Sequence, residues 1–238
     1  MLVNLKEILK IAEEKKIAIG MFNATGFDSL QAVIAAAEEL DQPVIIAHAE
    51  VHNVYNDIDL VGPAMIAMAK NAKVPVCVHL DHGTSLEMIW RALRIGFTSV
   101  MIDASALPYE ENLRLTKQVT EAAHAMNVSV EAELGRLVTG ENGEAAEGVV
   151  RPEDFYTAQP KLDFDVVKNV AEATGLPLVM HGGSGVSEDG FRQAIANGIR
   201  KINYYSYMSK AGYEAAKAAI ESGKSSIIET SNERRSFL

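Results

Sequence analysis

Short apolar segments alternate with longer segments of helical periodicity along almost the whole chain. Strands are predicted over residues 17–22, 43–49, 74–80, 99–103, 128–134, 177–182 and 201–205. Helices are predicted after them, over residues 27–39, 60–71, 85–95, 109–126, 164–173, 188–197 and 210–221, and an amphipathic helix precedes the first strand. Strands that are apolar almost throughout, each followed by a helix, are typical of a parallel sheet covered by helices.

Polar residues stand at the end of every predicted strand. They are Asn23, His48, Asp81 with His82, Asp103, Glu133, His181 and Asn203. A (β/α)8 barrel builds its active site from the carboxyl ends of all its strands, whereas a doubly wound sheet gathers such residues only near its switch point. The distribution therefore favours an α/β fold of the TIM (β/α)8-barrel type.

The predicted strands number one fewer than an eight-stranded barrel needs. The interval from Gly135 to Leu162 is too polar and too short to hold a loop, a helix and a buried strand. We therefore predict one domain over residues 1–238, a barrel that lacks one βα unit with its sixth strand, and an irregular polar loop over 137–160. Such a barrel leaves two strand edges with unpaired backbone groups. Either the neighbouring strands close the gap, or segment 137–160 plugs it, or the barrel is open.

Composition excludes several classes of protein. The chain has 22 Lys and Arg against 32 Asp and Glu, a net charge of −10, which argues against a nucleic-acid partner. Its single cysteine, Cys77, excludes a disulfide framework and fits a reducing compartment. Charges in the first helix exclude a secretory signal, and no apolar run approaches the roughly 18 residues of a membrane helix. We predict a cytoplasmic protein with no membrane or nucleic-acid partner.

Two motifs at strand ends could carry chemistry. In HLDHG, residues 79–83, the adjacent Asp81 and His82 suit metal-assisted proton transfer, because imidazole binds a metal and carboxylate moves a proton. The alternative is a helix cap or a hydrogen-bonded pair in a loop. In HGGSG, residues 181–185, the glycine N–H groups and the Ser184 hydroxyl could cradle a phosphate, and the alternative is an ordinary tight turn.

The interior of the predicted barrel carries charge. Glu131 and Glu133 are two residues apart, so both point to one side of their strand. Buried carboxylates need a cation or an internal basic residue as a partner. His79 is expected to be a packed, hydrogen-bonded strand residue, and Cys77 to be part of the core rather than a nucleophile.

Six segments, in this order, resemble the class II, metal-dependent fructose-bisphosphate and tagatose-bisphosphate aldolases. They are HLDHG, SVMIDAS, VEAELGR, LDFDVVKNV, LVMHGGSGV and GIRKINYYS. The resemblance implies a (β/α)8 barrel that assembles as a homodimer or homotetramer. It also implies reversible cleavage of a ketose bisphosphate to glycerone phosphate and an aldehyde, with Zn²⁺ as the cofactor.

The same resemblance implies roles for individual residues. Asp81 would be the acid/base at the C4 hydroxyl, and His82 and His181 two of three zinc ligands, with Glu133 supporting the metal site. The residues implied to hold glycerone phosphate are Gly182, Ser184, Asn203 and Ser206.

The chain departs from the family where the sixth strand should be. Family members carry there a GTAHG-like motif whose histidine is the third zinc ligand, and this chain has no such motif. His48 or Glu133 could complete the set, since catalytic zinc usually has three protein ligands. The alternatives are a non-catalytic member that binds a phosphosugar or stabilises a partner subunit, a Schiff-base aldolase using Lys201, and a deletion variant of an ordinary aldolase.

Overall fold

The computed structural model describes residues 1–134 and 162–223. The predicted polar loop 137–160 lies outside the described residues. The strands are β1 (Leu2–Val3), β2 (Ile19–Asn23), β3 (Val44–Ala49), β4 (Val76–Gly83), β5 (Ser99–Ile102), β6 (Ser129–Ala132), β7 (Leu178–Met180) and β8 (Ile199–Asn203). The helices are α1 (Leu5–Lys15), α2 (Phe27–Glu39), the 3₁₀ helix η1 (Glu50–Val54), α3 (Ile58–Asn71), α4 (Leu86–Ile95), α5 (Tyr109–Ala125), α6 (Phe164–Thr174), α7 (Glu188–Ala196) and α8 (Ser206–Glu221).

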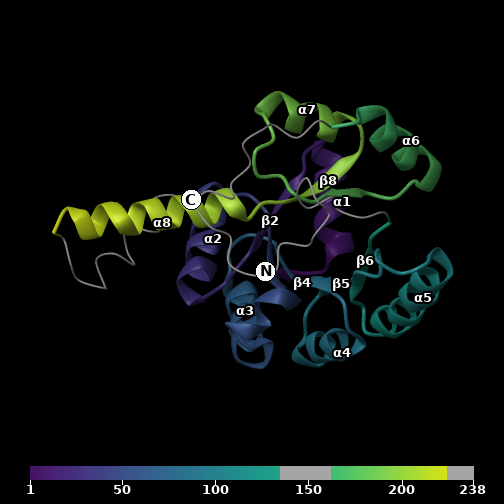
Figure 1. Ribbon diagram of the computed structural model, residues 1–238, viewed down its shortest axis with the longest axis horizontal. Coiled ribbons are helices and arrows are strands. Elements are labelled where there is room, and N and C mark those ends of the chain that lie inside the picture. The colour runs from purple at the N-terminus through teal and green to yellow at the C-terminus, as the bar shows by residue number, and fades with distance from the viewer. Residues whose placement is uncertain (135–161, 224–238) are drawn as a thin grey trace.

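All the strands pair in parallel, and their order follows a barrel. The sheet runs β6-β5-β4-β3-β2-β8-β7, and the short β1 pairs with β4. The pairing of β2 with β8 joins strands from the two ends of the chain, with Ile19 opposite Lys201 and Met21 opposite Asn203. Helices lie around the outside of the sheet (Figure 1). The predicted α/β architecture of parallel strands and covering helices is confirmed.

The barrel is open between β6 and β7 within the described residues. No strand pairing joins these two strands in the ranges 1–134 and 162–223. The opening falls where the sequence lacks a sixth barrel strand, so the predicted shortage of one βα unit agrees with the observed sheet. Of the three outcomes left open by the sequence, direct pairing of the neighbouring strands is excluded.

Helix α1 lies across one end of the barrel. It begins with a capping box, in which the Asn4 side chain accepts from the Glu7 N–H and the Glu7 carboxylate accepts from the Asn4 N–H. Its buried face, which includes Ile8 and Leu9, packs on inward-facing strand residues such as Met21. Because α1 contacts β2, β4, β6 and β8, it spans strands on both sides of the opening.

The larger core lies between the sheet and the outer helices. Outward-facing Ile46, Val78 and Val100 of the central strands pack there with residues of the surrounding helices, and all three side chains are fully buried. A smaller cluster around Met180 and Ile199 joins β7 and β8 to α6 and α7. Helices therefore cover the outer face of the sheet, and the polar residues at the strand ends are not part of these cores.

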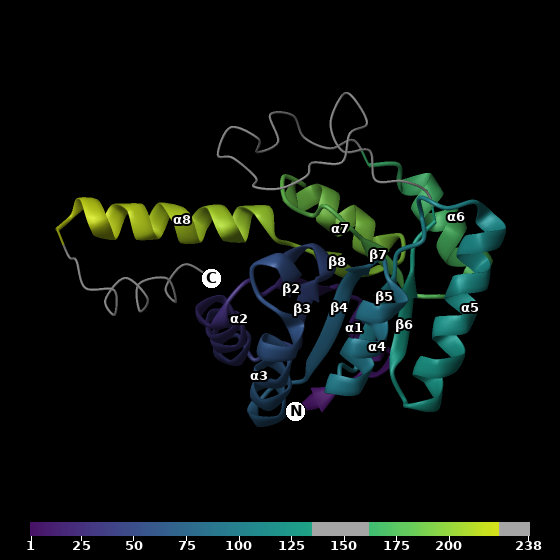
Figure 2. The ribbon, with the colours of Figure 1, turned by 60° about the horizontal axis from the view of Figure 1, so that its bottom comes forward.

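The structure corrects the end of the sequence prediction. The last strand was predicted over 201–205, but β8 ends at Asn203, and the helix predicted over 210–221 begins at Ser206. The strand also begins earlier than predicted, at Ile199, and includes Arg200 and Lys201, which are both buried although a charged pair is not expected inside a buried strand. Helix α8 extends away from the sheet (Figure 2). The short β1 and η1 were not predicted from the sequence.

None of the helices within 1–134 and 162–223 has the length and apolar character needed to cross a membrane.

Candidate active site

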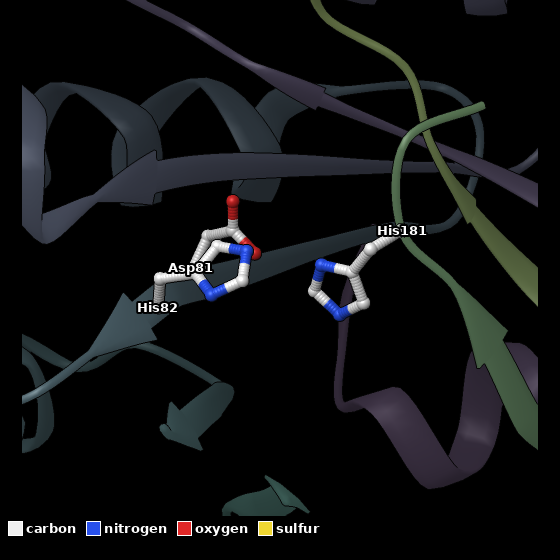
Figure 3. Close-up of side chains that lie close together, drawn as sticks. All are labelled: Asp81, His82 and His181. Carbon is white, nitrogen blue, oxygen red and sulfur yellow. The ribbon is translucent and has the colours of Figure 1, made fainter. Parts of the chain in front are cut away.

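Three side chains from distant parts of the chain meet at the carboxyl ends of the strands. Asp81 and His82 belong to the end of β4, and His181 directly follows β7. One ligand atom from each lies within 4.8 Å of the others. The two imidazole centroids are 4.6 Å apart, and Figure 3 shows a ring nitrogen of His181 turned towards Asp81 and His82.

Two amide groups hold the Asp81 carboxylate in place. Asn23 Nδ2, at the end of β2, donates to Oδ2 at 2.8 Å, and Asn203 Nδ2, at the end of β8, donates to Oδ1 at 3.2 Å. Burial alone would raise the pKa of Asp81, but nearby Lys201 and His82 outweigh it and leave that pKa below its ordinary value. The group is thus an oriented, ionised carboxylate.

His82 occupies an unusual backbone position. Its φ of 44° lies in the left-handed region, next to an irregularity in the pairing of β4 with β5. Such strain in a non-glycine residue tends to occur at functional sites. Its Nδ1 lies 2.7 Å from Asp103 Oδ2. Burial lowers the pKa of His82, but the hydrogen bond with Asp103 and the charge of Asp81 raise it to about 9.

Glu133 approaches His82 from the end of β6, which is separated from β4 by β5. Its Oε2 is 3.8 Å from His82 Nδ1, is buried, and has no hydrogen-bond partner among the described residues. Burial and the nearby Asp103 raise the pKa of Glu133. Asn112 Nδ2 donates to the Glu133 carbonyl at 2.9 Å and fixes the backbone. His82, Asp103 and Glu133 form a second group whose ligand atoms lie within 4.8 Å of one another.

These side chains fit a divalent metal ion. Imidazole nitrogens and carboxylate oxygens are the ligands that zinc takes in proteins, and an orphaned buried carboxylate oxygen is costly without a partner. Of the predicted ligands, His82 belongs to both groups, His181 to the first and Glu133 to the second. His48 belongs to neither group.

The HGGSG segment packs against the start of α8. Gly182 has a φ of 69°, a conformation that favours glycine. At Gly183 a Cβ atom would lie 2.9 Å from the Asn203 carbonyl oxygen, so only glycine allows this approach. Ser184 is buried, and its Oγ accepts from the Tyr207 N–H at 3.3 Å. Ser206 is the first residue of α8.

Asn203 differs from the other residues predicted to hold phosphate. Its Nδ2 is shared between Asp81 Oδ1 and His181 Nδ1, the latter at 3.0 Å. The amide nitrogen is therefore engaged with the predicted acid/base and the predicted ligand, and its buried Oδ1 has no hydrogen-bond partner among the described residues.

A buried ion pair between Lys201 and Glu131 lies beneath the site, a contact that could not be predicted from the sequence. Lys201 Nζ donates to Glu131 Oε2 at 2.9 Å, and the Lys201 side chain has no exposed surface. Of the two partners that the sequence left open, a cation or an internal basic residue, Glu131 has the basic residue, whereas Glu133 Oε2 has no hydrogen-bond partner among the described residues. A fully buried ammonium that donates to a carboxylate also argues against Lys201 as a Schiff-base nucleophile.

Two other buried residues behave as predicted. His79 Nδ1 lies 2.9 Å from Ser99 Oγ, and burial together with Lys201 lowers the pKa of His79 to about 3. Burial raises the pKa of the Cys77 thiol to about 12, and Cys77 is part of the core.

Comparison with known proteins identifies the family. A model of class II fructose-bisphosphate aldolases matches residues 3–159 and 150–237. A fructose-bisphosphate aldolase of Geobacillus stearothermophilus is 40% identical over 231 residues, covering 85% of this chain and 80% of the relative. The chain belongs to the class II fructose-bisphosphate aldolase family. Class II aldolases are lyases and are generally metal-dependent, so the enzyme class implied by the resemblance is confirmed.

The class II fold is also found in solved structures. The YdjI aldolase of Escherichia coli K12 superimposes with a TM-score of 0.86 at 35% identity, covering 99% of this chain and 92% of that one. The parallel sheet, which is open between β6 and β7 within the described residues, is therefore a class II aldolase barrel.

The comparisons are consistent with the missing unit. A fructose-bisphosphate aldolase of Staphylococcus epidermidis is 35% identical over 252 aligned residues, covering 94% of this chain and 87% of the relative. Since 252 exceeds the 238 residues of this chain, the relative has residues at positions where this aldolase has none. The two matches to the family model meet at residues 150–159, between β6 and α6.

Proposed function

We propose that this protein is a metal-dependent aldolase that cleaves a ketose 1,6-bisphosphate, of fructose or tagatose, to glycerone phosphate and glyceraldehyde 3-phosphate. The observation that carries the proposal is the convergence of Asp81, His82 and His181 within 4.8 Å at the carboxyl ends of the strands. Relatives named fructose-bisphosphate aldolase support the choice of substrate class.

The metal proposed is Zn²⁺, held by His82, His181 and Glu133. When bound, the ion supplies a Lewis acid that polarises the ketose carbonyl, so the reaction needs no lysine Schiff base. The orphaned Oε2 of Glu133 supports its place in this set. Because Glu133 approaches from the side of Asp103, it would have to turn towards His181 to complete the set.

Asp81 is proposed as the acid/base. Its ionised carboxylate, fixed by Asn23 and Asn203, is suited to accept the proton of the C4 hydroxyl as the C3–C4 bond breaks and the aldehyde forms. Gly182, Ser184, Asn203 and Ser206 are proposed to hold the phosphate of glycerone phosphate. The glycine loop that packs on the first turn of α8 supports this site, because helix N-termini favour anions.

Catalysis is proposed to be weaker than in an eight-stranded aldolase. The whole chain has six histidines, and none stands in a GTAHG-like motif. With two imidazoles and one displaced carboxylate, the metal would be held more loosely than by three histidines. The same observation supports a second candidate function: a non-catalytic member that binds a phosphosugar or stabilises a partner subunit.

Reconstitution with zinc tests the two candidates. The protein is loaded with Zn²⁺, its metal content is measured, and cleavage of fructose and tagatose bisphosphates is followed by a coupled assay. We expect zinc-dependent turnover that His82→Ala abolishes and that His124→Ala, on helix α5, leaves unchanged. Absence of bound zinc and of turnover would refute the aldolase. Phosphosugar binding without zinc would then favour the non-catalytic member.

Assembly and location are part of the same proposal. We propose a cytoplasmic homodimer or homotetramer with no nucleic-acid or membrane partner. The extended α8, with exposed Tyr213 and Ile220, supports assembly. Light scattering coupled to size-exclusion chromatography would measure the mass, and a monomer would contradict the expected state.

A further inference from the structure

The imidazole of His181 is held by a partner on each of its two nitrogens. Nε2 lies 3.0 Å from Glu131 Oε1, and Nδ1 lies 3.0 Å from Asn203 Nδ2. The His181 side chain is 12% exposed and the Glu131 side chain 5%, so water competes little for these contacts. The tautomer of the ring therefore follows from what each partner can do.

Each of the two partners of His181 can be only a donor or only an acceptor in its hydrogen bond with the ring. Asn203 Nδ2 also faces Asp81 Oδ1 at 3.2 Å, and because that carboxylate accepts, the amide nitrogen and not the amide oxygen must point there. The same nitrogen then donates to His181 Nδ1, which must carry a lone pair. Glu131 is ionised beside Lys201 and can only accept, so His181 Nε2 must carry the hydrogen.

We infer that Glu131, anchored by Lys201, is a positioning residue that fixes His181 as the Nε2–H tautomer and leaves Nδ1 unprotonated on the side of Asp81 and His82, where its lone pair accepts from Asn203 Nδ2. The inference rests on the proposed role of His181 as a metal ligand. Histidine ligands commonly donate their second N–H to a carboxylate, which orients the ring and raises its basicity. Here the carboxylate comes from β6 and its cation from β8.

The pair is built as a rigid support. Lys201 and Glu131 come from strands that do not pair with each other, and both side chains are buried. His79 also lies beside the pair, with its Nε2 3.6 Å from Glu131 Oε2 and its Nδ1 facing Ser99 Oγ. A carboxylate with one oxygen on Lys201 and the other on His181 has little freedom to rotate.

Nuclear magnetic resonance of the metal-free wild-type protein tests the tautomer directly. Two-bond ¹H–¹⁵N correlations of ¹⁵N-labelled histidine, with His181→Gln used only for assignment, distinguish a protonated from an unprotonated Nδ1. We expect the Nε2–H form for His181. An Nδ1–H form would overturn the inference, and this measurement needs no metal and no stability-altering variant.

The double variant Glu131→Met, Lys201→Met tests the consequence for metal binding. Replacing both members of a buried ion pair with apolar side chains of similar length avoids an orphaned charge. We expect zinc affinity, measured by competition with a chromophoric chelator, to fall about 10- to 100-fold. Glu131→Gln with Lys201→Met retains an amide oxygen as acceptor and should recover part of the loss. Wild-type affinity in the double-methionine protein would overturn the inference.

Ser99→Ala is the matched control. It removes a hydrogen bond from the same buried interior, the one to His79, without touching His181. We expect zinc affinity to stay at the wild-type value. If Ser99→Ala weakens zinc binding as much as the double-methionine variant does, the effect is general loosening of the interior and the inference fails. If wild-type protein binds no zinc at all, the proposed metal site fails, and the tautomer measurement still decides the positioning role.

Discussion

Single residues in this site form hydrogen bonds in which the donor and the acceptor are fixed by the neighbouring groups. Asp81 receives one amide hydrogen on each oxygen, and His181 receives one hydrogen bond and gives another. A carboxylate fixed in this way loses little freedom when a substrate arrives, and its lone pairs keep one direction. Exchange of one functional group should therefore change the chemistry and also leave a buried partner without its hydrogen bond.

Asp81→Asn should lower turnover, and it should also cost some stability, because its amide nitrogen would face the Nδ2 donor of Asn23 or Asn203. The amide keeps the shape of the side chain but cannot accept a proton from a substrate hydroxyl, and loss of a positioned acid/base typically costs about 10²- to 10⁴-fold in kcat. The measurement is steady-state cleavage of fructose bisphosphate by zinc-loaded protein, with metal content and circular dichroism as controls. Unchanged kcat in a fully loaded variant would contradict the assigned role.

The residues of the site could be predicted individually, but their contacts could not. The residue types and their positions at strand ends identify Asp81, His82 and His181 from the sequence. The Glu131–Lys201 contact joins residues 70 positions apart, and the placement of Asn203 on Asp81 joins residues 122 apart. Such pairs depend on strand register and side-chain direction, which a single sequence does not specify.

Secondary-structure elements hold the open barrel together at the end away from the site. Helix α1 contacts strands on both sides of the opening, and buried Arg200 of β8 forms an ion pair with Glu13 of α1. Arg200 also donates to the carbonyls of Ile195 and Ile199, at 2.7 and 2.8 Å. The N-terminal helix is thus an internal brace, a role that its amphipathic sequence alone does not reveal.

Ile8→Ala should destabilise the protein strongly. Ile8 has no exposed surface and packs against inward-facing strand residues, so the substitution leaves a cavity that costs about 2–5 kcal/mol. Urea unfolding followed by circular dichroism measures the loss. Lys10→Ala, at a side chain 77% exposed on the same helix, is the control and should change stability by less than about 0.5 kcal/mol. Equal effects of the two substitutions would show that α1 is not a brace.

Because of the Glu13–Arg200 ion pair, the free energy of unfolding should decrease at acidic pH. Hydrogen bonds from Arg200 and Lys16 lower the pKa of Glu13 from 4.5 to about 2 in the folded protein. A depressed folded-state pKa stabilises the protein above pH 4.5, and this contribution is lost as pH falls towards 2. Because Glu13 is about half exposed, solvent screening limits the contribution to about 1 kcal/mol or less.

Glu13→Gln should therefore be less stable than wild type at pH 6, with the difference shrinking between pH 4.5 and 2.5. Urea titrations at several pH values measure it. Glu14→Gln is the control, since Glu14 meets only Lys10 at 3.9 Å on the exposed face of the helix. A difference between wild type and Glu13→Gln that is constant with pH would contradict the assignment.

The whole molecule is an eight-fold architecture with one position unfilled among its described strands. Its topology could be predicted from the alternation of strands and helices, and the shortage could be predicted by counting strands. The exact limits of β8 and α8 could not; β8 begins at Ile199, before the predicted strand, and includes the buried Arg200 and Lys201. Their burial depends on Glu13 and Glu131, partners from distant segments.

Hydrogen exchange should report the opening. Strands β3 and β4 are paired on both sides, whereas β6 and β7 each have one pairing partner within the described ranges. Amides of β6 and β7 should therefore exchange faster than those of β3 and β4 in the native protein. Exchange followed by mass spectrometry with peptide-level resolution measures this difference. Equal protection across all four strands would mean that the edges are covered.

Glu131 lies beside the opening between β6 and β7, where no strand pairing joins the described residues. It reaches from β6 to His181 beyond β7 and to Lys201 on β8, so side chains connect what strand pairing does not. The contacts of Glu131 that join β6 to β8 therefore also orient His181, the proposed metal ligand. By thermodynamic linkage, a metal ion that binds only the folded protein with these contacts formed also stabilises them. The free energy of unfolding should therefore be highest when the metal is bound.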